Sequence, residues 1–203
     1  FEFASLDPHF SSFAQDISLQ RMLWRGLYAL DKDNKPQPAM ASALPQISAD
    51  GKTYTIKLRA GLKWSDGTAL TAADFEFGIK RTCNPVIAGE YEYIIDAIIL
   101  GCAAHYGNNP GFDQALEDAI GVKAVDATTL EIKLAQAQPT FTIILSLWMT
   151  FPAPKHLFTS TSDDWPTDPA KLAYNGPYIL TSYTPQASVD LAPNPNWAAP
   201  AGV

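Results

Sequence analysis

The stretch LKWSDGTALTAADFEFGIKR, residues 62–81, decides the fold because it joins a turn, a helix start and an apolar helix without interruption. Asp66 and Gly67 are typical of a tight turn, since an aspartate side chain accepts backbone N–H bonds and glycine tolerates a positive φ. Thr71 and Asp74 have the spacing of a capping box, with threonine as N-cap and aspartate reaching back from the third helical position. The sequence therefore predicts a helix over about 72–81 and structural roles for both aspartates.

The same two carboxylates allow one enzymatic hypothesis, a hydrolase in which Asp66 and Asp74 act as acid and base on a glycosidic bond. No serine or cysteine stands in a nucleophile signature. The three histidines, His9, His105 and His156, lie in unrelated segments and are predicted to be surface or turn residues rather than general bases. We therefore predict no catalytic residue and no enzyme.

The composition excludes several classes of partner and cofactor. The 203 residues carry a net charge of −7, and lysine and arginine are scattered along the chain, so no basic stripe exists to bind nucleic acid. No metal-ligand spacing and no phosphate-binding loop occurs, so neither a metal site nor a cofactor is expected. The longest apolar runs fall well short of the roughly 18 residues that span a bilayer. The chain opens on FEFASLDPHF without a signal peptide, so either an export signal was removed or none was made.

The two cysteines, Cys83 and Cys102, stand 19 positions apart and match no zinc or redox motif. Two interpretations stay open. One is a local disulfide formed in an oxidising compartment, and the other is a pair of buried free thiols.

Hydrophobic periodicity and turn signals predict a mixture of helices and antiparallel hairpins, which is the pattern of an α+β fold. Further helices are expected at about 15–25, 90–100 and 140–149. Strands are expected after the Asp50-Gly51 turn, at 53–59, and as a second hairpin over 122–134. A last hairpin pairs Tyr178–Tyr183 with Ala187–Leu191.

The order of these segments resembles a known family. SLDPHF, LWRGLYALDKDNKPQPAMASALP, DGKTYTIKLRAGLKWSDGTALTAADFEFGIKR, GVKAVDATTLEIKL and YNGPYIL with LAPNPNW follow one another as in the family 5 extracellular solute-binding proteins of the oligopeptide-binding type. The resemblance implies a periplasmic-binding-protein-like fold, in which two lobes close over a ligand by hinge motion. It assigns residues 1–30 and 155–203 to a discontinuous first lobe and residues 31–154 to an inserted small subdomain. The second lobe is expected to be missing.

The resemblance also implies a function. Such proteins are extracytoplasmic receptors that capture a short peptide and deliver it to the membrane permease of an ABC transporter. The implied location is the periplasm or the cell surface, with export and the option of a lipid anchor on a removed N-terminus. The implied partners are a small solute, the permease and the missing second lobe, which a separate fragment could supply. Alternatives are a receptor for an oligosaccharide or a metal chelate, a chaperone-like interaction module, and the hydrolase described above.

Six ligand-binding candidates follow from matching the family's motifs. They are Tyr91, which follows the NP after the long helix, then Phe10, Ser11 and Phe13 in the loop after LDPH, and finally Asn175 and Gly176 in YNGPY. Tyr91 and the YNGPY pair have structural alternatives. Tyr91 could belong to the core of the subdomain, and Asn175 with Gly176 could form only a tight turn.

Overall fold

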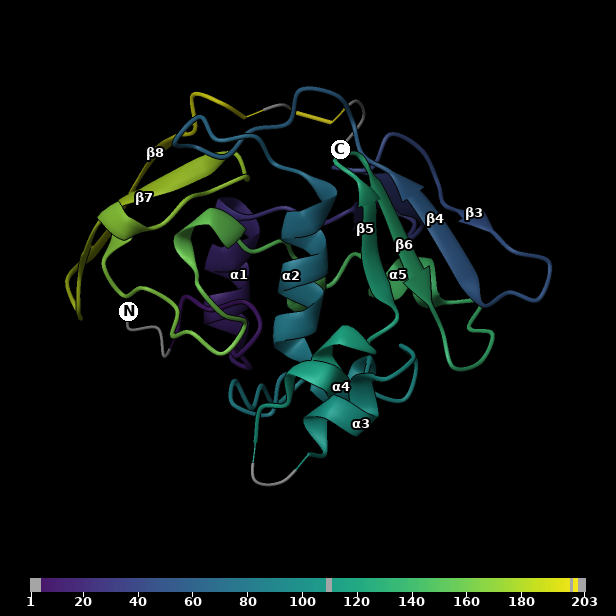
Figure 1. The fold of residues 1–203 in the computed structure, drawn as a ribbon. Coiled ribbons are helices and arrows are strands. Elements are labelled where there is room, and N and C mark those ends of the chain that lie inside the picture. Colours follow the sequence, from purple (N-terminus) through teal and green to yellow (C-terminus); the bar gives the residue numbers. More distant parts are fainter. Residues whose placement is uncertain (1–4, 109–110, 198, 201–203) are drawn as a thin grey trace.

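The computed structural model describes residues 5–108, 111–197 and 199–200 (Figure 1). Its largest sheet has four antiparallel strands in the order β3-β4-β6-β5. Two smaller antiparallel pairs are β1-β2 and β7-β8. The strands are β1 (Tyr28–Leu30), β2 (Pro36–Pro38), β3 (Gln46–Ile47), β4 (Thr53–Lys57), β5 (Val122–Asp126), β6 (Thr129–Lys133), β7 (Tyr178–Thr184) and β8 (Ser188–Pro193).

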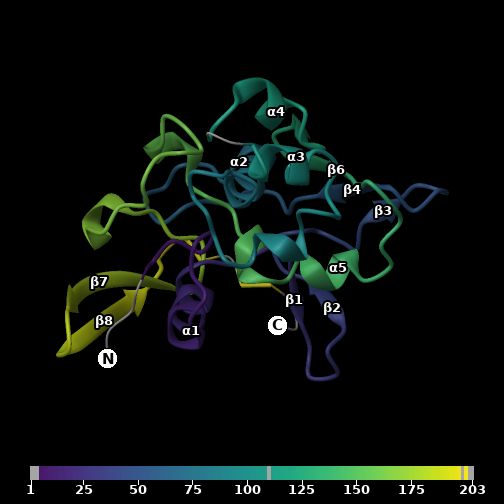
Figure 2. The same ribbon diagram turned by 90° about the horizontal axis from the view of Figure 1, so that it is seen from below.

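The helices are short except for two. The α-helices are α1 (Ala14–Leu23), α2 (Ala72–Thr82), α3 (Cys102–Tyr106), α4 (Gln114–Asp118) and α5 (Phe141–Ile144). The 3₁₀ turns are η1 (Glu92–Ile94), η2 (Trp148–Thr150), η3 (Lys155–Leu157) and η4 (Pro169–Lys171). In Figure 1, α2 runs through the middle, with α1 and the β7-β8 hairpin on one side and the four-stranded sheet on the other. Figure 2 shows β1-β2 projecting beside α5. The α+β prediction is confirmed.

Helix α2 is the central element of the core. Nine of its 11 residues are buried, so it packs against neighbours on all sides rather than on one stripe. A Cβ added at Gly78 would lie 2.3 Å from the carbonyl oxygen of Phe151. The chain after η2 therefore crosses α2 in direct backbone contact, which only glycine at this position permits.

The cap of α2 matches the sequence prediction. The Oδ2 atom of Asp74 accepts hydrogen bonds from the Thr71 amide at 2.7 Å and from the Thr71 hydroxyl at 3.1 Å. Its other oxygen accepts from the Lys155 amide at 3.1 Å. Because both oxygens bind the scaffold, Asp74 fixes the start of α2 and also attaches the segment that leads into η3.

Thr71→Ala is expected to lower the free energy of unfolding by about 1 kcal/mol, since an N-cap is worth roughly that much. Urea denaturation measures the change, with Thr184→Ala at the exposed end of β7 as the control. If both variants lose the same free energy of unfolding, the Thr71 cap does not stabilise α2 beyond an ordinary surface threonine.

One predicted helix is wrong and another is predicted too long. Residues 90–100 form only η1 and turns, because the amide of Leu100 bonds to Lys133 and Ile99 bridges Leu134 at the end of β6. The β-branched isoleucines of residues 90–100 also disfavour a helix. The helix expected at 140–149 ends after Ile144, where Leu147 takes an extended backbone. His105 is also buried, not a surface residue. The predicted strands and the helices α1 and α2 are confirmed within a few residues.

Candidate functional site

The loop formed by residues 5–13 is anchored by a buried ion pair. Arg81 on α2 is fully buried, and its Nη2 donates to Oδ2 of Asp7 at 2.6 Å. Its Nη1 donates to the carbonyl oxygens of Thr161 at 3.0 Å and Asp163 at 2.7 Å. One guanidinium therefore joins α2 to two segments that lie far from it in the sequence.

His9 completes this anchor. Its Nδ1 lies 3.1 Å from Oδ1 of Asp7, and its Nε2 lies 3.0 Å from the carbonyl oxygen of Phe151. Burial alone would raise the pKa of the Asp7 carboxyl, but the Arg81 charge and the bonds from His9 together lower that pKa to about 2. Asp7 is therefore a permanent anion at neutral pH, and the loop has a fixed position.

The anchored loop turns two aromatic side chains outward. Phe10 is 46% exposed and Phe13 is 53% exposed, although both are large and apolar. Ser11 between them is buried. Its hydroxyl accepts from Gln20 Nε2 at 2.6 Å, and its carbonyl oxygen accepts from Trp148 Nε1 at 3.0 Å. Of the three predicted loop residues, Ser11 thus holds the loop, and the two phenylalanines present its surface.

Tyr91 lies beside the same loop. Its ring packs edge-on to Trp148 with the centroids 4.9 Å apart, and Tyr93 stacks on it at 5.9 Å. A Cβ added at Gly89 would lie 2.1 Å from the carbonyl oxygen of His9, so the two backbones touch. The structure therefore brings Tyr91 and the 10–13 loop together. We call the side chains of Phe10, Phe13, Tyr91 and Tyr93 the aromatic face.

A pocket of about 440 Å³ opens beside Phe10, and we call it the Phe10 pocket. Its lining combines apolar side chains with the buried ion pair and includes Asp7, Phe10, Arg81, Val86 and Trp165. Two buried donors of the lining residues, Nε of Arg81 and Nε1 of Trp165, have no hydrogen-bond partner in the described part of the chain. A buried donor of this kind needs an acceptor from water or from a ligand.

Asn175 and Gly176 lie elsewhere, at the other end of α1. The Oδ1 of Asn175 accepts from the Arg25 amide at 3.0 Å, and its Nδ2 donates to the Arg25 carbonyl oxygen at 2.9 Å. The amide of Gly176 donates to Leu23, and a Cβ there would lie 2.6 Å from the Leu23 carbonyl carbon. The 10 residues of α1, at about 1.5 Å of rise each, separate this cluster from the aromatic face.

The aspartates of the hydrolase hypothesis are bound to the scaffold. Oδ2 of Asp66 lies 2.7 Å from Nε2 of His156, and its Oδ1 accepts from the Thr68 amide. Burial raises the pKa of the Asp74 carboxyl. Burial would also raise the pKa of Asp66, but its hydrogen bonds to Thr68 and His156 outweigh that effect and lower it. Opposite shifts suit an acid and base pair. However, both oxygens of Asp74 accept backbone hydrogen bonds, which explains its position without catalysis.

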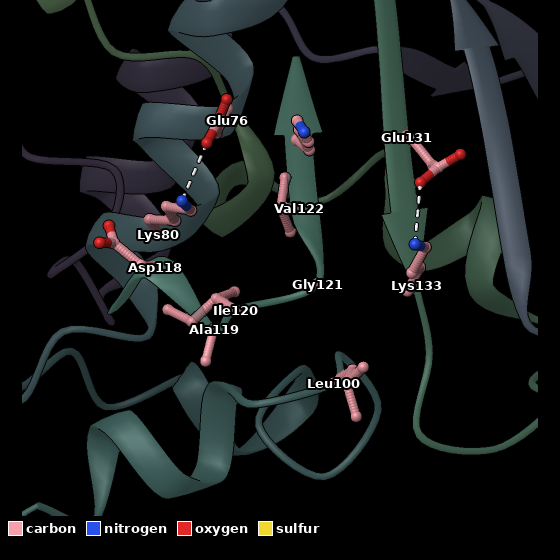
Figure 3. Close-up of a pocket in the computed structure, with 11 residues that line it drawn as sticks. Glu76, Lys80, Leu100, Asp118, Ala119, Ile120, Gly121, Val122, Glu131 and Lys133 are labelled. Carbon is pink, nitrogen blue, oxygen red and sulfur yellow. Dashed lines mark ion pairs between the residues drawn. The ribbon is translucent and has the colours of Figure 1, made fainter. Parts of the chain in front are cut away.

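Sequence reasoning did not find a second pocket, of about 490 Å³, between α2, the end of α4 and the β5-β6 hairpin (Figure 3). Four of its six charged side chains pair with one another. Glu76 and Lys80 pair at 2.8 Å, and Glu131 and Lys133 pair at 3.3 Å, as the dashed lines in Figure 3 show. Glu76 also accepts from the amide of Ala124. With these groups already paired, the pocket offers a ligand less than the aromatic face does.

The described residues contain no cluster of three or more histidine, cysteine or acidic side chains placed to hold a metal ion. Within the same residues, none of the helices has the length and apolar character that crossing a membrane requires.

Comparisons with known proteins agree on one family. Residues 35–202 match the family model for bacterial extracellular solute-binding proteins, family 5 Middle. The probable deoxycholate-binding periplasmic protein YgiS of Escherichia coli K12 is 35% identical over 86% of this chain and 32% of its own length. The periplasmic oligopeptide-binding protein OppA of the same strain is 32% identical over 97% of this chain and 35% of its own.

Solved structures of similar fold belong to solute-binding proteins as well. The substrate-binding domain of an oligopeptide ABC transporter from Bacillus anthracis superimposes with a TM-score of 0.86 at 34% identity, over 97% of this chain and 36% of that one. The Escherichia coli murein tripeptide binding protein MppA gives 0.85 at 29% identity, over 97% and 37%. This chain thus spans about a third of the length of the relatives it matches. It belongs to the bacterial extracellular solute-binding proteins, family 5.

Proposed function

We propose that the protein acts in a solute receptor that captures a short peptide outside the cytoplasm, and that the aromatic face is its ligand surface. The observation that carries the proposal is the aromatic face itself. The exposed rings of Phe10 and Phe13 stand on a loop that a buried ion pair holds in place, and half-buried Tyr91 and exposed Tyr93 lie beside it. Rigid aromatic side chains give a ligand a large contact area at little entropic cost. The Phe10 pocket adds space for a side chain of the ligand.

Peptide is the leading ligand class because OppA of Escherichia coli and several other relatives are named for binding oligopeptides or dipeptides. A second class is favoured by the relative named for deoxycholate, since an apolar steroid would also suit an aromatic surface. Oligosaccharides and metal chelates remain the alternatives within the receptor class. A catalytic role is not part of the proposal.

We further propose that the protein delivers its ligand to the permease of an ABC transporter. It would be exported, with or without a lipid anchor. Residues 1–30 and 155–203 would belong to one lobe, and residues 31–154 would be inserted in it. Hydrogen bonds from Trp24 to Ala173 and from Gly176 to Leu23, which join the two outer segments, support this division. A second lobe would close over the aromatic face.

Replacing Tyr91 or Phe10 with alanine is expected to weaken ligand binding about tenfold, which corresponds to roughly 1.4 kcal/mol. Isothermal titration calorimetry measures the effect and identifies the ligand class. Its separate arms use uncharged tripeptides to pentapeptides, sodium deoxycholate and maltotriose. Tyr178→Ala on β7 removes an exposed aromatic ring away from the aromatic face and serves as the control. If the Tyr91, Phe10 and Tyr178 variants all bind the ligand with the affinity of the unsubstituted chain, the aromatic face is not the ligand surface.

A further inference from the structure

Two arginines at the C-terminal end of α1 lie beside each other without a compensating charge. Arg21 is in the last turn of α1, and Arg25 follows the helix. Neither forms an ion pair within the described residues. Arginine is favoured at the C-terminal end of a helix by the helix dipole, which accounts for Arg21. It does not account for a second arginine placed against the first.

Both arginines line one small pocket. It measures about 190 Å³, and its other walls are Tyr28, β1, Ser146 and Phe151. Pockets for drug-sized ligands measure roughly 300–1,000 Å³, so this one suits a group of a few atoms. No acidic side chain of the described residues lines it.

Arg25 is held in place rather than free to turn into solvent. Its backbone amide and carbonyl both bond to the side chain of Asn175. Its guanidinium lies over the ring of Trp197, 5.8 Å from the centroid, and its buried Nε has no hydrogen-bond partner in the described chain. Burial, and then the charge of Arg21, lowers the pKa of Arg25, so the positive form is destabilised by its surroundings.

We propose that this pocket binds a small oxyanion, a carboxylate, phosphate or sulfate group, between the guanidinium groups of Arg21 and Arg25. Planar guanidinium donors match the geometry of such anions, and an anion would relieve the repulsion between the two cations. In this proposal the anion also supplies an acceptor for the Nε of Arg25, which has no partner among the described residues. Asn175 and Gly176 act here as positioning residues, because they fix Arg25 and the end of α1. This site does not depend on the proposed receptor function.

Proton and nitrogen NMR of the arginine Nε–H groups tests the site. The chain is titrated at constant ionic strength with sodium phosphate, sodium sulfate and sodium acetate in separate arms against sodium chloride. We expect a saturable shift of the Arg25 Nε–H signal with at least one oxyanion and none with chloride. Response to acetate alone assigns the site to a carboxylate of a protein or peptide, and response to phosphate or sulfate assigns it to an inorganic anion.

Matched variants separate binding from a structural role. Arg21 is exposed. Arg21→Gln is expected to weaken anion binding at least tenfold without lowering the melting temperature in chloride, since it removes the repulsion between Arg21 and Arg25. Arg25→Gln is expected to abolish binding, and Lys63→Gln, exposed and elsewhere, is expected to change nothing. Shifts that follow ionic strength alone, or that survive Arg21→Gln unchanged, would overturn the proposal.

Discussion

Replacing Arg81 with methionine is expected to lower the free energy of unfolding by about 3–5 kcal/mol, because it leaves the buried Asp7 carboxylate without its cationic partner on α2. The side chain of Arg81 is fully buried and that of Asp7 is 7% exposed, so the carboxylate loses most of the solvation that would offset the lost bond. The variant also loses the two bonds to the carbonyl oxygens of Thr161 and Asp163. Chemical denaturation measures the loss, and Lys63→Met at an exposed position is the control.

The acid response of the same pair provides a second readout. The pKa of Asp7 is lowered in the folded state to about 2 from its ordinary value of 3.8. A lowered carboxyl pKa stabilises the fold above the unfolded value, and the stabilisation is lost as the pH falls from about 4 to about 2. The difference corresponds to roughly 2 kcal/mol. Arg81→Met should flatten this part of the pH profile, and a variant that keeps both the stability and the profile would refute the anchor.

Removing the disulfide is expected to have the next largest effect. Cys83 at the end of α2 and Cys102 at the start of α3 are joined, with their Cα atoms 5.1 Å apart and a sequence separation of 19. Closing a loop of that length restricts the unfolded chain, which is worth about 3 kcal/mol in the chain-entropy account. Cys83→Ala with Cys102→Ala should show this loss in urea denaturation.

Reduction supplies the matching control for the disulfide. A thiol reductant should destabilise the unsubstituted chain by a similar amount and leave the double alanine variant unchanged. If the reductant has no effect on the unsubstituted chain, and mass spectrometry finds two free thiols, the alternative of buried free cysteines is correct.

Elements with local signals were predictable from the sequence. The capping box at Thr71 and the Asp50-Gly51 turn each carry their information within a few residues, so α2 and β4 appear where the pattern indicates. Residues 90–100 carry no such signal. Their apolar spacing fits a helix although their isoleucines disfavour one, and the outcome depends on a contact with β6, which starts 29 positions after Leu100.

The candidate site was predictable in part. The motif match singled out Tyr91 and Phe10, and the structure places them near each other through Trp148 and Gly89. The anchor beneath them was not predictable, because a lone Asp7 and a lone Arg81 look like surface charges until the fold buries both. The same holds for Arg21 and Arg25, whose pocket needs Ser146 and Phe151 from a distant segment.

We propose above that a ligand binds on the aromatic face. The direct measurement is a backbone NMR titration of the 203-residue chain with the best ligand from the calorimetric arms. A one-sided surface buries less of a ligand than a closed cleft, so the method must detect weak binding. The account predicts the largest shifts at Phe10, Phe13, Tyr91 and Tyr93 and in the neighbouring Trp148 indole. Shifts confined to the pocket of Glu76, Lys80 and Lys133 in Figure 3 would contradict it.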